Sequence, residues 1–135
     1  MTAATVELEI NLASLLRASA GTNRQAIETF SVLNLGLIES LRSGTINANE
    51  CVARFYNAAN CSYVRRKIKN PICDEIMSRG VQLPDLFDIL PPSAARRQFS
   101  KELNAMGQLC LKLLRTVQRK RNSGLTRSGP SRRAG

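Results

Sequence analysis

A regular spacing of apolar residues near the C-terminus constrains the fold more than any other feature of the sequence. The intervals between these residues are four, three, four, three and four: Phe99, Leu103, Met106, Cys110, Leu113 and Val117. Because residues three and four apart share one face of an α-helix, the spacing predicts a long helix over about residues 94–121. An apolar stripe of this kind packs either inside a helical bundle or against a partner helix in a coiled coil. We therefore expect contact with a protein partner, or a homo-oligomer, through the 94–121 helix.

A second long helix is predicted over residues 22–42. Thr22 and Gln25 have the spacing of a capping box, in which each side chain accepts a hydrogen bond from the other residue's backbone N–H. Gly44 can take the left-handed conformation that commonly ends a helix. Apolar residues are numerous between these two ends, so we expect this helix to be central and largely buried.

A third helix is predicted over residues 48–69. Asn47 and Glu50 form another capping pair at its start. The helix should end before Pro71, because proline disfavours helical geometry in the residue that precedes it. Between this helix and the last one we expect a short connector of two helical pieces, with Gly80 ending the first and Pro84 opening the second.

The N-terminal segment has two interpretations. Residues 5–12 alternate between apolar and polar side chains as a strand would, yet their leucines also share a helical face with residues farther along. We predict a helix over 5–19 and keep the strand as the alternative. The sequence then predicts an all-α fold, a small bundle of about four main helices plus the short helical connector, as one helical domain over residues 1–121.

Positive charge is concentrated at the C-terminus. The whole chain has a formal net charge of +10, and residues 112–135 contain eight Lys/Arg and no acid. Residues 122–135 also have almost no apolar side chains, so burial cannot offset the entropy lost on ordering them. We therefore predict a disordered basic C-terminal tail over 122–135.

The residues that most enzymes need are missing. The chain has no histidine, which removes the commonest general base and most zinc sites. Its glycines are scattered and give no phosphate-binding loop, and its four cysteines have no metal-binding spacing. We therefore expect no enzyme activity, no catalytic residues, no cofactor and no metal. No apolar run is long enough to cross a membrane, and the acidic N-terminus is unlike a targeting presequence, so we expect a cytoplasmic protein without a membrane partner.

Cys61 is the one cysteine with two interpretations. Arg54 and Arg65 occupy neighbouring helical positions, and cations beside a thiol stabilise its thiolate. The alternatives are a reactive thiol on a basic helical face and an incidental one.

Two groups of basic residues are the candidate contact sites. One is the 65–69 cluster, with Arg65, Arg66, Lys67 and Lys69. The other spans the end of the last helix and the tail: Arg119, Lys120, Arg121, Arg127, Arg132 and Arg133. Our first hypothesis is a non-enzymatic helical interaction or adaptor protein, which would use exposed apolar surface of the last helix for self-association or a partner. The basic residues are then possible contacts for an acidic partner. The alternative is a nucleic-acid-associated accessory protein that binds phosphates without sequence specificity.

Overall fold

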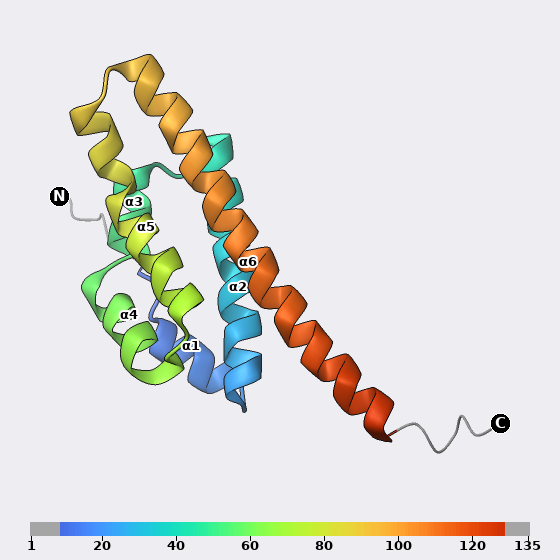
Figure 1. Ribbon diagram of the computed structural model, residues 1–135. Helices are drawn as coiled ribbons and strands as arrows, with labels where there is room; N and C mark the ends of the chain where they lie inside the picture. Colours follow the sequence, from blue (N-terminus) through green and yellow to red (C-terminus); the bar gives the residue numbers. More distant parts are fainter. Residues whose placement is uncertain (1–8, 129–135) are drawn as a thin grey trace.

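The computed structural model describes residues 9–128, with side chains described for residues 9–120. This part of the chain contains six α-helices, one π-helical turn and no strand, which confirms the predicted all-α bundle (Figure 1). The elements in chain order are α1 (Leu12–Ser19), α2 (Asn23–Ser43), α3 (Ala48–Arg54), α4 (Ala58–Tyr63), η1 (Val64–Ile68), α5 (Pro71–Ile89) and α6 (Pro92–Ser128).

The three longest helices form the centre of the bundle. Helix α6 packs against both α2 and α5, and it runs antiparallel to α5, with which it forms a hairpin (Figure 1). Arg79 ties the two helices of the hairpin together, since its guanidinium donates to Glu75 of α5 at 3.0 Å and to Glu102 of α6 at 2.8 Å. The short helices α1, α3 and α4 cover the remaining side.

The apolar stripe of the last helix lies inside this core. One of its six members, Phe99, is half-buried. The other five are buried: Leu103, Met106, Cys110, Leu113 and Val117. The spacing allowed either packing inside a bundle or packing against a partner helix. In this chain the stripe packs inside the bundle, and we call these six residues the seam of α6.

Both predicted capping boxes are present. The side chains of Thr22 and Gln25 cap α2 reciprocally, and those of Asn47 and Glu50 cap α3 in the same way. Gly44 ends α2 with a φ of 80°, as its position predicts. These local signals set the boundaries of α2 and the start of α3.

The predicted single helix over 48–69 is wrong, because the chain breaks after Arg54. Phe55 leaves helical geometry at φ −135°, and Asn57 then caps α4 by accepting from the N–H of Asn60. Phe55 and Tyr56 are both fully buried, although a straight helix would point consecutive side chains about 100° apart. The break places both rings in the core, where they pack edge to face at 5.0 Å.

The helix predicted over 5–19 starts later than expected. Asn11 caps α1 at Leu12, and residues 9–11 run beside the break between α3 and α4. Asn60 holds them there, since its side chain accepts from the Leu12 N–H at 3.0 Å and donates to the Ile10 carbonyl at 2.8 Å. The strand alternative is not seen at Ile10, whose N–H pairs with the carbonyl of Arg54 at a helix end. Residues 5–8 lie outside the described residues.

The predicted connector is one continuous helix, α5, so the assignment of Gly80 and Pro84 as breakers is wrong. A Cβ on Gly80 would lie 2.5 Å from the ring carbons of Tyr56. Gly80 therefore allows α5 to pack closely against Tyr56, and it does not form a turn. Pro84 lies inside the helix and removes only the bond to the carbonyl of Gly80. Packing of α5 against α6 and α3 holds it together across both residues.

The last helix also extends past its predicted end at residue 121. Helix α6 continues through Asn122, Ser123 and Gly124 to Ser128. Adding residues to an existing helix avoids the cost of nucleation, so a well-packed helix can extend into a polar segment. Residues 129–135 of the predicted tail lie outside the described residues.

Candidate functional site

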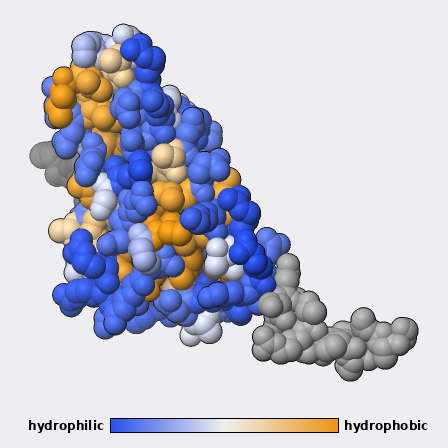
Figure 2. Space-filling view, in the orientation of Figure 1, coloured by the Kyte–Doolittle hydropathy of each residue, from blue (hydrophilic) through white to orange (hydrophobic). Residues whose placement is uncertain are grey.

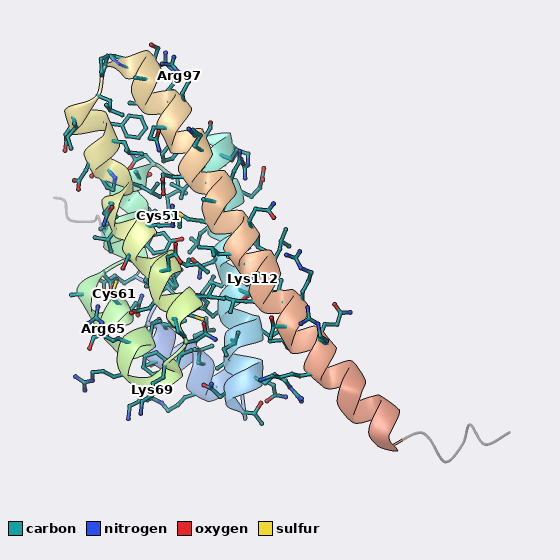
Figure 3. The ribbon with its side chains drawn as sticks, viewed as in Figure 1. Cys51, Cys61, Arg65, Lys69, Arg97 and Lys112 are labelled. Carbon is teal, nitrogen blue, oxygen red and sulfur yellow. The ribbon has the colours of Figure 1, made fainter. Side chains whose placement is uncertain are left out.

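The antiparallel hairpin brings two basic groups from distant parts of the sequence to one end of the bundle. Helix α5 begins where the second half of α6 lies, so the 65–69 cluster and the basic residues after Leu111 share that end (Figure 1). Figure 3 shows Arg65 and Lys69 there and Lys112 about halfway along α6, where its side chain is exposed. The fold thus joins what the sequence shows as separate clusters.

The π-helical turn η1 presents the first group. Val64 and Ile68 are buried and anchor the turn, while Arg65, Arg66 and Lys67 between them are exposed. Lys69 ends the turn in the left-handed region at φ 55°, and its N–H donates to the Val64 carbonyl at 3.0 Å. A residue other than glycine is uncommon in this conformation, and π-turns are frequent at functional sites.

Helix α6 presents the second group. Its seam residues Leu113 and Val117 face the core, which leaves Lys112, Arg115 and Arg119 on the solvent side together with Lys120. The sequence of α6 contains a single acid, Glu102, which is engaged by Arg79 near the other end of the helix. The solvent face of the second half of α6 is therefore purely basic among its charged side chains.

The junction of α1 and α2 adds Arg17 and Arg24, both exposed, at the same end of the molecule (Figure 1). We call the whole set the basic end: Arg17, Arg24, Arg65, Arg66, Lys67, Lys69, Lys112, Arg115, Arg119 and Lys120. The first two turns of α2 and α5 contain three acids, Glu28, Asp74 and Glu75, and Glu75 is paired with Arg79. The basic end thus has a large excess of positive charge.

The predicted contact residues divide into three sets. Arg65, Arg66, Lys67, Lys69, Arg119 and Lys120 are exposed at the basic end. Arg121 and Arg127 lie on the backbone of α6, beyond the described side chains, and Arg132 and Arg133 lie outside the described residues.

Four cations of the basic end were missed as site residues. Lys112 and Arg115 had a usable signal, because they fall between the seam positions of α6. No sequence pattern pointed to Arg17 and Arg24, because only the fold places α1 and α2 near η1 and the second half of α6.

Cys61 does not have the environment of a reactive thiolate. It is half-buried, and burial raises its pKa even though the guanidinium of Arg65 acts to lower it. Burial raises the pKa of Cys51, Cys73 and Cys110 to about 12. All four thiols are free, and at neutral pH they are protonated.

Two other kinds of site are absent from the part of the chain that the structure describes. Within residues 9–128, no three His, Cys, Asp or Glu side chains gather as metal ligands would. None of the helices there combines the length and the apolar character that a membrane crossing requires.

The sequence matches the model of the family described as "Protein of unknown function (DUF3969)" over residues 22–125. The chain belongs to this family. The DUF3969 match begins at the N-cap of α2 and includes η1 and the second half of α6, and so most of the basic end. No curated protein and no solved structure matches the chain.

Proposed function

We propose that this protein is a non-enzymatic, nucleic-acid-associated accessory protein that binds a phosphate backbone at its basic end. The observation that carries the proposal is the gathering of η1, the α1–α2 junction and the second half of α6 at one end of the bundle. A surface with this excess of cations attracts polyanions, and neutralising each phosphate releases bound counterions.

The cations of the basic end are available for an external anion. Arg65 forms an ion pair with Asp74 at 3.9 Å, but the two side chains are 64% and 42% exposed, and such a surface pair is worth only about 0–1 kcal/mol. No other cation of the basic end forms an ion pair or hydrogen bond within residues 9–120. Phosphates would therefore meet little competition from the protein's own acids.

The chemistry of this surface favours binding without sequence preference. Lysine and arginine contacts to phosphate position a protein on nucleic acid but do not read its bases. Tyr63, the aromatic residue nearest the cluster in sequence, is half-buried, so it is poorly placed to stack on single-stranded bases. We expect duplex binding to depend on charge and shape alone.

The test is fluorescence anisotropy with a duplex of 12 base pairs, which is about 41 Å long. Affinity should fall linearly with salt on a log–log plot. Replacing Arg115, Arg119 and Lys120 by Gln should weaken binding and reduce the slope by up to about 2.7, at about 0.9 for each phosphate that is no longer neutralised. The triple variant Arg66→Gln, Lys67→Gln, Lys69→Gln should act in the same direction.

The matched control removes three cations from the opposite end of α6, namely Arg96→Gln, Arg97→Gln and Lys101→Gln. This variant has the same net charge as either triple, so it should bind the short duplex more tightly than both. Absence of binding at low salt refutes the proposal. An equal loss in all three variants shows that net charge, rather than the basic end, is responsible.

A second candidate function is contact with another protein, as the first sequence hypothesis proposed. The seam of α6 is not its surface, because the seam packs in the core. The observation that favours this role lies elsewhere, in the exposure of Phe87 and Ile89 near the turn between α5 and α6. A cytosolic location is part of both proposals and is supported by the four free cysteines.

A further inference from the structure

Helix α6 extends beyond the bundle that it helps to form. Among its described side chains Val117 is the last that is buried, and residues 118–120 are all exposed. The helix itself continues to Ser128 and projects past the other helices (Figure 1). At about 1.5 Å per residue, residues 118–128 form about three turns with a length of about 16 Å. We call residues 118–128 the projecting helix.

The projecting helix is not a continuation of the apolar seam. The seam spacing of three and four residues would next fall on positions 120 and 124, which are Lys120 and Gly124. The projecting helix also contains no acid, and Figure 2 shows hydrophilic surface on α6 next to the segment drawn in grey. A coiled-coil partner needs apolar residues at these positions, so the sequence favours a polyanionic partner over a second helix.

The cations of the projecting helix are distributed around its axis. Arg119, Lys120 and Arg121 occupy consecutive positions, which lie about 100° apart on an α-helix. Arg127 occupies a further position two turns after Lys120. A helix that lies on a flat surface uses one face only. Cations on several sides instead suit a site that has phosphates on both sides of the helix.

The major groove of B-form DNA is such a site. It is about 12 Å wide and about 8.5 Å deep and admits an α-helix, whose diameter with side chains is about 10–12 Å. Phosphates border the groove on both edges, and contacts to them position a protein without reading the bases. A helix of about 16 Å spans about five base pairs, at about 3.4 Å for each.

The rest of the basic end lies at the base of the projecting helix. The η1 turn and the junction of α1 and α2 are at the end of the bundle from which α6 projects (Figure 1). Arg17 and Arg24 are exposed at this junction, and Arg65 and Lys69 are exposed at η1. A duplex that receives the projecting helix in its groove therefore presents its neighbouring phosphates to these cations.

Double-stranded RNA does not offer the same site. The major groove of an A-form helix is deep and narrow, and protein side chains do not read it. RNA has the same charge on each phosphate as DNA, so attraction by charge alone would not distinguish the two duplexes. A preference for DNA would therefore report on the shape of the groove.

We propose that the projecting helix lies in the major groove of duplex DNA, with the rest of the basic end against the phosphates beside the groove. This inference rests on the proposed nucleic-acid function, for which it names the substrate class. The fit depends on groove width and on charge, and it requires no base sequence.

The first test compares duplexes of 12 base pairs and identical sequence by fluorescence anisotropy. The full-length protein should bind DNA at least about tenfold more tightly than RNA. A third duplex is DNA whose cytosines carry a glucosylated hydroxymethyl group at C5, which keeps every phosphate but fills the major groove. This modification should weaken binding by at least about tenfold.

The second test separates the helix from its charge with two variants at one position. Gly124→Pro interrupts the projecting helix, because proline removes a backbone N–H and clashes with the preceding turn. It should weaken DNA binding by at least about tenfold, whereas Gly124→Ala favours the helix and should tighten binding by up to about fivefold. Both variants keep the net charge of the wild type. Urea unfolding checks the bundle, which should be unaffected because Gly124 lies beyond Val117, the last buried position.

Equal affinity for DNA and RNA overturns the inference, and so does equal affinity for DNA with an open and a filled major groove. Equal binding by Gly124→Pro and Gly124→Ala also overturns it, because flexible arginines would then suffice. In each of these cases the protein still binds phosphates, so the proposed function stands. Absence of binding to every duplex at low salt refutes the proposed function itself, and the inference with it.

Discussion

The phenolic hydroxyl of Tyr56 donates a hydrogen bond of 2.7 Å to Oδ1 of Asn34 in the interior of the bundle. Both side chains are fully buried, and the amide of Asn34 in turn donates to the Phe30 carbonyl at 2.9 Å. Burial raises the pKa of Tyr56 well above its ordinary value, so the hydroxyl keeps the proton that it donates. This pair links α2 to the break between α3 and α4.

Tyr56→Phe should lower the free energy of unfolding by about 1–3 kcal/mol, because it leaves the buried Oδ1 of Asn34 without a donor. Urea unfolding followed by circular dichroism measures the change. Tyr63→Phe is the control, since Tyr63 is half-buried and its hydroxyl has no hydrogen-bond partner in the described part of the chain. Equal stability of Tyr56→Phe and the wild type would contradict a structural role for this bond.

Gly80→Ala should destabilise the protein by about 1–3 kcal/mol, because the new methyl group would meet the ring of Tyr56 at 2.5 Å. Gly36→Ala is the matched control within a helix. Its Cβ would find nothing within 4 Å, so it should stabilise the protein by about 0.5–1 kcal/mol. Thermal melts of both variants would show the opposite signs, and equal effects would argue against the close approach of α5 to Tyr56.

Leu113→Ala should cost about 2–5 kcal/mol, since Leu113 is buried in the seam of α6. Leu111→Ala changes the same residue type on the same helix, but Leu111 is 39% exposed and its loss should cost much less. Denaturant midpoints compare the two. If Leu113→Ala kept full stability, the seam would not belong to the core of the single chain.

Stability should fall as the pH rises from about 9 towards 12. Burial raises the pKa of Cys51, Cys73 and Cys110 to about 12, against an ordinary value of 9.0. Unfolded thiols lose their protons above pH 9 while native thiols keep them, so the stabilisation is fully present below pH 9 and is lost across this window.

Each buried thiol contributes a loss of up to about 1.4 kcal/mol per pH unit within that window. Urea midpoints measured between pH 8 and about pH 10.5 would follow it. Cys110→Ala lowers the starting stability but should make the decline with pH shallower. A decline of unchanged steepness would mean that Cys110 does not titrate on unfolding.

Some elements could be predicted because their signals are local. The capping boxes at Thr22 and Asn47 involve residues only three positions away, and the seam of α6 follows from helical periodicity alone. Other elements depend on distant residues. The break before α4 is held by Asn60, which binds the Ile10 carbonyl 50 positions earlier in the chain.

Gly80 and Pro84 illustrate the opposite error. Both residues usually interrupt helices, yet tertiary packing overrides the local preference once Tyr56 occupies the space over Gly80. For the site, the 65–69 cluster was visible in the sequence, but its neighbours were not. Arg17 and Arg24 join it only because the fold places the junction of α1 and α2 at the same end.

The separation of the basic end from the turn between α5 and α6 has a consequence for how the molecule approaches a partner. An uneven charge distribution exerts a torque in the field of a polyanion, so the chain would turn while still diffusing. This pre-orientation acts beyond contact range but fades within a Debye length, about 8 Å at physiological salt. The basic end would face the polyanion on approach, and Ile89 would face the solvent. A molecule that binds in this way has Ile89 directed away from the polyanion.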